Sequence, residues 1–480
     1  MLKLEKFKKT YLISLLVMLI FRSVNAYSLL PSEFDRIIFA VLGLTGGIFM
    51  LQELYYLIQK KKLFSWDSLL LVFLFFFGIS ILINHDGSFG SNINLFVWTS
   101  FYLIGIYGFS KRNFESIEFI NLINKVLIIS YFIMSIISFI MYLLKFSYVY
   151  VYGSGPRDHI RIGFLESRLF GVFGDPNYGA TMALVVLILS VFYLIDSWKK
   201  ISLASKVFYT FNAVLQFSVI LLSGSRSALS ISFFVIAWIT FIYSFQLVGK
   251  KDINNLVLKV TLSILASLVV IIFYFGLQTG TKKVLQTLPQ HIHYELKVNN
   301  EYEKREFKVG LGTSKKSEIS LTRKDVAENQ DISNMRFSIW KSAIEIFKTT
   351  PLVGTSPRNI INYAHKNLPN TFIAQKSIVV HNAYINILVS TGLLGFLPFI
   401  IFMIINVFSL LVFFFRNRKY LPNYFNIYLT VLAVLVLSGL FNNELVLVNT
   451  IGAFIFWLYL GNLNGYMREG CLDGKHKNES

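Results

Sequence analysis

The sequence predicts an all-α polytopic membrane protein with about twelve transmembrane helices and a long extracytoplasmic loop between helices 9 and 10. Three observations lead to this fold class. Hydrophobic residues make up 55% of the 480 positions, and the mean hydropathy is +0.59. Twelve apolar segments meet the requirement of about 20 residues for crossing a bilayer. Basic residues recur in every second connection between these segments. A soluble protein with a large core does not combine these features.

The apolar segments define the expected spans. The first is the weakest, because Arg22 interrupts it. The run that begins at Tyr11 lacks a small-residue cleavage site, so we expect a spanning helix there and not a signal peptide. The single cysteine, Cys471, excludes an intrachain disulfide. The segments lie at about 10–30, 37–57, 66–84, 92–110, 122–144, 178–195, 204–222, 226–247, 255–277, 394–415, 424–442 and 446–464.

The distribution of Lys and Arg predicts the orientation. Connections that are rich in these residues remain in the cytoplasm. The alternate connections, such as 84–92 and 442–444, carry almost none. We therefore expect both termini in the cytoplasm. The net charge of +19 then marks topology and does not indicate a nucleic-acid partner. The basic connections are Lys3–Lys9, Lys60–Lys62, Lys111–Arg112, Lys199–Lys200, Lys250–Lys251, Arg416–Lys419 and the tail after Arg468.

Four regions follow from this topology. Residues 1–277 hold helices 1–9, 278–380 form an extracytoplasmic loop subdomain, 381–465 hold helices 10–12, and 466–480 are a cytoplasmic tail. Within the loop, apolar residues at helical spacing predict an amphipathic helix from about 334, which Pro351 ends. Residues 291–324 alternate charged and apolar side chains, which leaves open a hairpin or a mobile segment.

The join between the long loop and helix 10 is the first candidate site. His381 and Asn382 stand at a predicted helix start, and Tyr384 follows on the first turn. An imidazole there lies at the water boundary, within reach of polar and lipid-linked substrates. A histidine at a helix start is also an ordinary cap or interface residue. Gly392 and Gly395 are expected to let another helix pack closely.

Two further outer connections carry unusual polar groups. Arg168 precedes Asp175-Pro176-Asn177, which is itself a turn and helix-start signal, so Asp175 and Asn177 are caps as readily as ligands. The short link 223–227 holds Arg226 at the membrane surface, where an unpaired arginine costs a few kcal/mol. Arg226 therefore needs a carboxylate, a lipid phosphate or a substrate anion as its partner.

A third polar group lies on the predicted loop helix, where Arg336 and Trp340 occupy adjacent turns. An exposed arginine on such a helix is commonly just a solvated residue. Arg336 gains interest only in combination with the other outer-face motifs.

In combination, the motifs resemble the O-antigen ligase and polymerase superfamily, which includes the Wzy-type polymerases of capsules and exopolysaccharides. The resemblance covers about residues 165–400 and depends on order and spacing, since each motif is short. The motifs are Asp-Pro-Asn at 175–177, Gly-Ser-Arg-Ser-Ala at 224–228, Arg-x-x-x-Trp at 336–340, Pro-Leu-Val-Gly at 351–354, His-Asn-x-Tyr at 381–384 and Gly-Leu-Leu-Gly at 392–395.

The resemblance implies a metal-independent glycosyltransferase without a cofactor. It also implies the cytoplasmic (inner) membrane of a bacterium. Its donor would be an undecaprenyl-diphosphate-linked oligosaccharide on the outer leaflet, and its protein partners would be a flippase and a chain-length regulator. In the superfamily an outer-face histidine and outer-face arginines are tied to activity. This implies a catalytic role for His381 and diphosphate binding by Arg226 and Arg336. Further candidates for substrate binding are Arg168, Asp175, Asn177, Asn382 and Tyr384.

Three alternatives stay open. A ligase of the same superfamily would use the same face and chemistry with a different acceptor. A flippase or exporter would be expected to line a central cavity with charges, and the middle spans lack acidic residues near their centres. A glycosyltransferase that uses a lipid monophosphate would place an acidic base in the first outer loop. Glu33 or Asp35 could serve there, although both are also ordinary loop residues.

Overall fold

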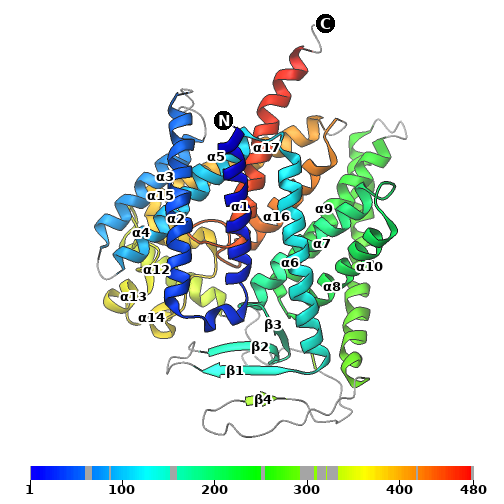
Figure 1. Cartoon of the computed structure of the whole chain (residues 1–480), viewed down its shortest axis with the longest axis horizontal. Coiled ribbons are helices and arrows are strands. Elements are labelled where there is room, and N and C mark those ends of the chain that lie inside the picture. The colour runs from blue at the N-terminus through cyan, green and yellow to red at the C-terminus, as the bar shows by residue number, and fades with distance from the viewer. Residues whose placement is uncertain are drawn as a thin grey trace. The chain divides into compact units, whose positions relative to one another are not determined.

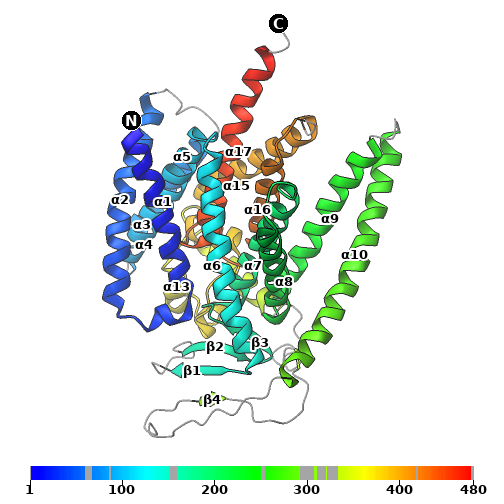
Figure 2. The ribbon, with the colours of Figure 1, turned by 45° about the vertical axis from the view of Figure 1, so that its right-hand side comes forward.

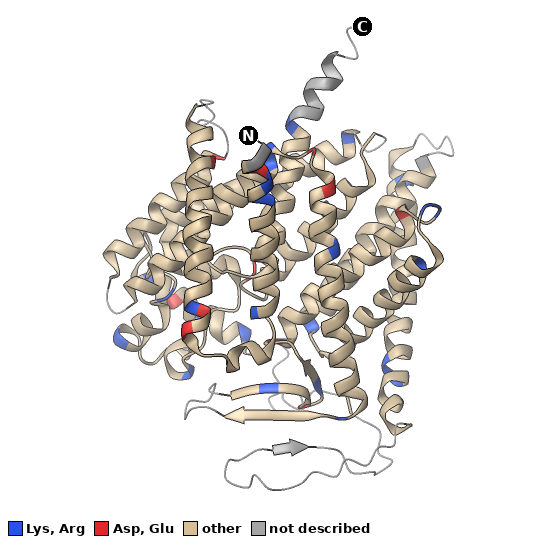
Figure 3. Ribbon diagram, viewed as in Figure 1, with Lys and Arg blue, Asp and Glu red and all other residues tan. Residues whose placement is uncertain are grey.

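The computed structural model is built mainly of helices, with one small sheet (Figures 1 and 2). The predicted class, an all-α polytopic membrane protein, is confirmed. Figure 3 shows long stretches of helix without charged residues, as expected for segments that cross a bilayer. The structure describes residues 2–59, 67–85, 88–151, 159–249, 255–291, 308–310, 320–321, 333, 335–417 and 420–476.

Each of the twelve apolar segments coincides with a helix. Among the described residues, eight helices are long and apolar enough to cross a membrane, and α3 and α16 are shorter apolar helices. The helices are α1 (Leu2–Arg22), α2 (Ser32–Gln59), α3 (Ser68–Ile83), α4 (Phe89–Ser100) continuing through the π-helix Phe101–Ile106 into α5 (Tyr107–Arg112), α6 (Ile117–Leu143), α7 (Pro176–Asp196), α8 (Leu203–Leu222), α9 (Arg226–Gly249), α10 (Leu256–Thr287), α15 (Ala383–Asn417), α16 (Asn423–Ser438) and α17 (Ile451–His476).

The chain folds as two compact units. The first contains residues 1–20, 30–123 and 331–480, and the second contains residues 21–29 and 124–330. The second unit holds most of α6, all of α7–α10 and an antiparallel sheet in the order β3-β2-β1-β4. Its strands are β1 (Ser147–Val151), β2 (His159–Leu165), β3 (Arg168–Gly171) and β4 (Lys308–Gly310).

This sheet was not anticipated from the sequence. Strands β1 and β2 pair antiparallel, with Tyr148 opposite Ile162. Strand β4 belongs to the segment 291–324, for which a hairpin or a mobile segment was considered, and it pairs with β1. The rest of that segment lies largely outside the described residues.

In the first unit, the end of the long loop forms a small helical layer. It consists of α12 (Arg336–Thr349), α13 (Ile360–Asn367) and α14 (Phe372–Lys376). The predicted amphipathic helix is confirmed as α12, whose apolar side chains Ile339, Ala343 and Ile346 are buried. They share one cluster with residues of α13, α14 and the start of α15. Burial of apolar surface contributes about 25 cal/mol per Å², so this cluster holds the layer together and attaches it to the start of α15.

Helix α15 contains a break at Gly392, where φ is 61° and ψ is −169°. The loop after α12 fills the break with its backbone. Leu393 N donates to Pro351 O (2.8 Å), and Leu394 N donates to Leu352 O (3.1 Å). Gly354 also has a positive φ, and a Cβ on it would lie 2.4 Å from the Ser390 carbonyl carbon. At Gly392 itself the close neighbour is therefore this loop backbone, whereas helix α3 packs against α15 beside it, where Ser80 Oγ donates to Ser390 O (2.7 Å).

Gly392→Ala is expected to lower the free energy of unfolding by about 3 kcal/mol, because only glycine adopts this backbone region without strain. The new Cβ would also lie 2.2 Å from Leu352 O. Thermal unfolding in detergent measures the effect. The matched control is Gly276→Ala in α10, where an added Cβ meets nothing within 4 Å. The control should be neutral or slightly stabilising, and equal midpoints for both variants would contradict the explanation.

Candidate functional site

His381 immediately precedes α15, and the neighbouring asparagine starts that helix. Asn382 Oδ1 accepts hydrogen bonds from the backbone N–H groups of Tyr384 and Ile385, both at 3.0 Å. This is the N-cap arrangement that satisfies the first donors of a helix. The Tyr384 hydroxyl donates to Val436 O at 2.9 Å. Asn382 and Tyr384 therefore have structural contacts that hold the half-buried His381 at the helix start.

The chain between α16 and α17 forms the other side of this helix start. We call residues 439–444 the outer turn. Ala383 N donates to Gly439 O (2.7 Å), and Asn382 Nδ2 donates to Leu440 O (3.1 Å). The guanidinium carbon of Arg336 lies 5.2 Å from the centroid of the Phe441 ring, which is a cation–π contact. The outer turn thus borders both the His381 helix start and Arg336.

A carboxylate in the outer turn was missed by the sequence analysis. Glu444 has 1% exposure and accepts a hydrogen bond from the hydroxyl of Ser438. A buried acid is costly unless it is hydrogen-bonded. The signal in the sequence was a lone acidic residue in a short link between two apolar spans. Residues 442–444 are used in the sequence analysis only as a connection that lacks Lys and Arg.

Arg336 is the first residue of α12 and is half-buried. Met335, which precedes it, has a left-handed backbone with φ 64°. One turn further along the helix, the buried indole N–H of Trp340 has no hydrogen-bond partner within the described part of the chain. A buried indole N–H usually has a partner. The Arg-x-x-x-Trp motif therefore contributes a cation and an available N–H donor on consecutive turns.

In the second unit, Arg168 joins the start of α7 to the end of α8. Its Nε donates to Ser223 O (2.9 Å), and its Nη2 donates to Asn177 Oδ1 (3.0 Å). Asp175 caps α7 by accepting from Asn177 N at 2.6 Å, with Pro176 at the first helical position. The capping interpretation of Asp175 matches this geometry. The side chains of Arg168 and Asn177 are therefore hydrogen-bonded to each other, and Arg168 also donates to the backbone of Ser223.

The link between α8 and α9 adopts a tight turn that sets the position of Arg226. Gly224 has φ 63°. The Ser225 hydroxyl accepts from Ala228 N at 3.4 Å, and Ser225 O accepts from Leu229 N at 3.1 Å, so Ser225 starts α9. Arg226 is the first residue of that helix and is half-buried. Its guanidinium therefore extends from a helix N-terminus, where backbone N–H groups also favour anions.

The structure thus assembles the predicted residues into two groups. Arg168, Asp175, Asn177 and the turn before Arg226 belong to the second unit, and His381, Asn382, Tyr384 and Arg336 belong to the first. A half-buried cation at a helix start can hold phosphate oxygens, and an imidazole at a helix start can accept or orient a proton. Within the described residues, no group of three His, Cys, Asp or Glu side chains is placed to hold a metal ion.

Comparison with known proteins finds a similarity over part of the chain. Residues 211–400 match the O-antigen ligase family. This match confirms the predicted resemblance to the O-antigen ligase and polymerase superfamily. No curated protein matches the chain. The matched O-antigen ligase region includes Arg226, Arg336 and His381, whereas Arg168, Asp175 and Asn177 precede it. The family implies a glycosyl-transferring enzyme, and the apolar helices indicate a multi-pass membrane protein.

Proposed function

We propose that this protein is a polysaccharide polymerase of O-antigen, capsule or exopolysaccharide. It would transfer a glycan from an undecaprenyl diphosphate donor to a lipid-linked repeat unit. The proposal depends on one observation: the O-antigen ligase match contains the three residues implied for the chemistry, His381, Arg226 and Arg336. Each of them lies at or beside the start of a helix, which supports a polar site at the membrane boundary. The alternation of basic connections supports the outer face of the cytoplasmic membrane as the place of this boundary.

The proposed reaction is a direct displacement at the anomeric carbon of the donor. The acceptor hydroxyl oxygen forms a bond to that carbon, while the bond from the carbon to the diphosphate oxygen breaks. The electron pair leaves with the diphosphate, and the hydroxyl proton goes to the His381 imidazole. A free histidine has a pKa of about 6.5, so it is a weak base toward an alcohol and the proton moves late. This displacement would invert the anomeric configuration.

Arg226 and Arg336 would hold the departing diphosphate. A guanidinium forms two parallel hydrogen bonds to phosphate oxygens, and these contacts strengthen as negative charge develops on the leaving group. Stabilisation that grows toward the transition state increases kcat, whereas equal binding of the ground state does not. No metal is needed for this step.

Chain growth by purified protein tests the proposal. The protein in liposomes is incubated with a lipid-diphosphate-linked repeat unit in the presence of EDTA. We expect a ladder of lengthening chains and release of undecaprenyl diphosphate, since the arginines perform the charge stabilisation. Chain growth only after addition of a divalent metal, or no growth at all, would refute the proposed reaction.

The acceptor distinguishes the polymerase from a ligase of the same superfamily. The same reaction is run with two acceptors in competition, the lipid-linked repeat unit and a lipopolysaccharide core. A polymerase extends the repeat unit, whereas a ligase transfers the glycan to the core. Transport of the intact lipid-linked unit without any change in chain length would favour the flippase or exporter.

A further inference from the structure

The first unit contains a cavity of about 450 Å³ that the proposed reaction does not use. It lies among the end of α2, the start of α3, α5 and the end of α17. By the distribution of basic residues, these helix ends belong to the face opposite that of His381. The charged residues in its described wall are Glu53, Asp67, Lys111, Arg112 and Arg468.

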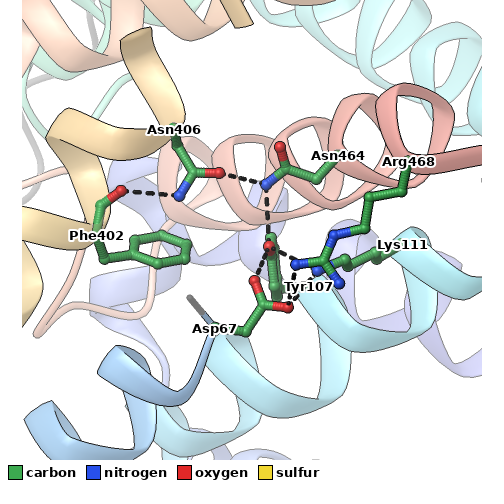
Figure 4. A network of polar contacts seen from close by, with 7 residues as sticks. All are labelled: Asp67, Tyr107, Lys111, Phe402, Asn406, Asn464 and Arg468. Atoms are coloured by element: carbon green, nitrogen blue, oxygen red, sulfur yellow. Dashed lines mark hydrogen bonds and ion pairs between the residues drawn. The ribbon is translucent and has the colours of Figure 1, made fainter. Parts of the chain in front are cut away.

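Asp67 is the centre of one cluster in this wall (Figure 4). Its carboxylate pairs with Lys111 and with Arg468 (3.2 Å), and it accepts a hydrogen bond from Tyr107 Oη (2.7 Å). Two cations and a hydroxyl donor therefore surround this carboxylate, and all three contacts favour its charged form.

The Asp67 cluster is anchored in the helix bundle. Tyr107 Oη accepts from Asn464 Nδ2 at 2.9 Å, and the same amide nitrogen donates to Asn406 Oδ1 at 2.5 Å. Asn464 and Asn406 are both buried. Figure 4 shows these side chains extending from Asp67 along α17 to α15. The cluster is thus held in a fixed position and does not need a ligand to order it.

Glu53 is the centre of a second cluster. It has 2% exposure and pairs with Lys8 (2.8 Å) and with Arg112 (2.5 Å). Each carboxylate is thus shared by two cations. Lys8 does not line the cavity, so its described wall holds three cations and two anions, which leaves an excess of one positive charge (3 − 2).

An excess of positive charge in a partly buried wall is costly unless an anion compensates it. Two arginines are equipped to bind one. Among the described residues, Arg112 and Arg468 each use only Nη2 in their ion pairs, and a guanidinium has five N–H donors. Forked contacts from arginine suit phosphate oxygens in particular.

The rest of the described wall is mainly apolar. It includes Leu57, Leu70, Leu71, Leu103 and Ile104. The cavity wall thus combines cations with aliphatic side chains. The cations suit a phosphate group, and the aliphatic side chains suit the apolar chains attached to it. Basic pockets between membrane helices bind the head groups of anionic lipids in this way.

We propose that this cavity binds an anionic phospholipid of the adjacent leaflet. Its phosphate contacts Arg112 and Arg468, and the part of its acyl chains nearest the phosphate lies along Leu70 and Leu71. This inference does not depend on the proposed glycosyl transfer, because it concerns a separate site. A free phosphate ion would satisfy the same cations, so the test must distinguish the two sources.

Binding is measured on the purified full-length protein in detergent by native mass spectrometry. The probes are phosphatidylglycerol, zwitterionic phosphatidylcholine and inorganic phosphate. We expect one retained phosphatidylglycerol per protein, little phosphatidylcholine, and no displacement by millimolar phosphate. Equal retention of both lipids, or displacement by inorganic phosphate, would overturn the proposal.

Three variants locate the site. Arg468→Gln removes one charge-assisted contact and should weaken binding by about tenfold or more. Gly108→Leu adds bulk to the cavity wall without removing a charged residue, and its Cβ has room, since it meets only Glu53 Cβ, at 4.0 Å. The matched control is Arg416→Gln at the end of α15, an exposed arginine outside the cavity wall.

The outcomes are distinguishable. Loss of phosphatidylglycerol in Gly108→Leu and Arg468→Gln, with retention in Arg416→Gln, supports the site. Undiminished binding in Gly108→Leu refutes it, whatever Arg468→Gln shows. Gly108→Leu keeps the charges and adds a good helix former, so we expect it to fold. Elution from a size-exclusion column as a single symmetrical peak is the check.

Discussion

His381→Ala is expected to abolish chain extension while donor binding persists, because the arginines would hold the diphosphate. Removal of a positioned general base typically lowers the rate by about 10²–10⁴-fold. The expected products are lipid-linked single repeat units without longer chains. Gel separation of lipid-linked glycans from cells that carry the variant provides the measurement, with the membrane level of the protein measured in parallel.

His381→Gln separates two roles of this residue. Glutamine can hold a hydroxyl by hydrogen bonding but cannot take its proton. If Gln is as inactive as Ala, His381 accepts the proton; substantial activity of Gln would mean that His381 positions the acceptor instead. His85→Gln is the matched control, since this exposed histidine lies at the end of α3 and its Nδ1 contacts Leu82 O at 3.3 Å. If both His381 variants make full-length polymer, His381 has no role in the reaction and is only the residue that precedes α15.

Arg226→Lys is expected to lower kcat/KM by about 10–100-fold, which corresponds to about 1.5–3 kcal/mol for a hydrogen-bonded charged contact. Lysine keeps the charge but loses the planar fork that binds two phosphate oxygens. Initial rates of chain growth by the purified variant measure the effect. The loss should appear in kcat as well as in KM, because the contact strengthens in the transition state.

The control for this variant is Arg416→Lys, which makes the same exchange at an exposed arginine at the end of α15. It should keep the parental rate. Full activity of Arg226→Lys would make Arg226 a simple charge anchor and would remove it from diphosphate binding. Thermal unfolding of both variants checks that the tight turn before α9 is intact.

Where hydrophobic pattern and local capping decide the conformation, the sequence was sufficient. The twelve apolar segments became helices, because a segment in lipid must satisfy its own backbone hydrogen bonds. The amphipathic spacing after 334 predicted α12, and Asp-Pro-Asn predicted the start of α7. The start of α15 after His381 and Asn382 follows from the same local rules.

The same pattern was misleading at residues 445–450, directly after the outer turn. Hydropathy places a span at 446–464, yet α17 begins at Ile451, and Leu445, Val446 and Leu447 are buried without being helical. Leu445 O instead accepts a hydrogen bond from Trp457 Nε1 at 2.8 Å. An apolar segment is expected to be buried. Whether it is helical depends on which groups form hydrogen bonds with its backbone N–H and C=O groups. For Leu445 the partner is a side chain twelve residues further on, in α17, and a hydropathy average does not report such a contact.

The sequence by itself determined the class of the protein, the helical spans and the set of candidate residues, because periodicity, charge and short motifs are local properties. Only the tertiary structure decided how the motifs are used. The Pro-Leu-Val-Gly and Gly-Leu-Leu-Gly motifs interlock at Gly392. Arg168 is committed to Ser223 and Asn177. Two cation pairs surround Glu53 and Asp67. Apart from the contact between Arg168 and Asn177, these contacts join segments far apart in the chain, and their energy depends on burial and distance, which folding alone supplies.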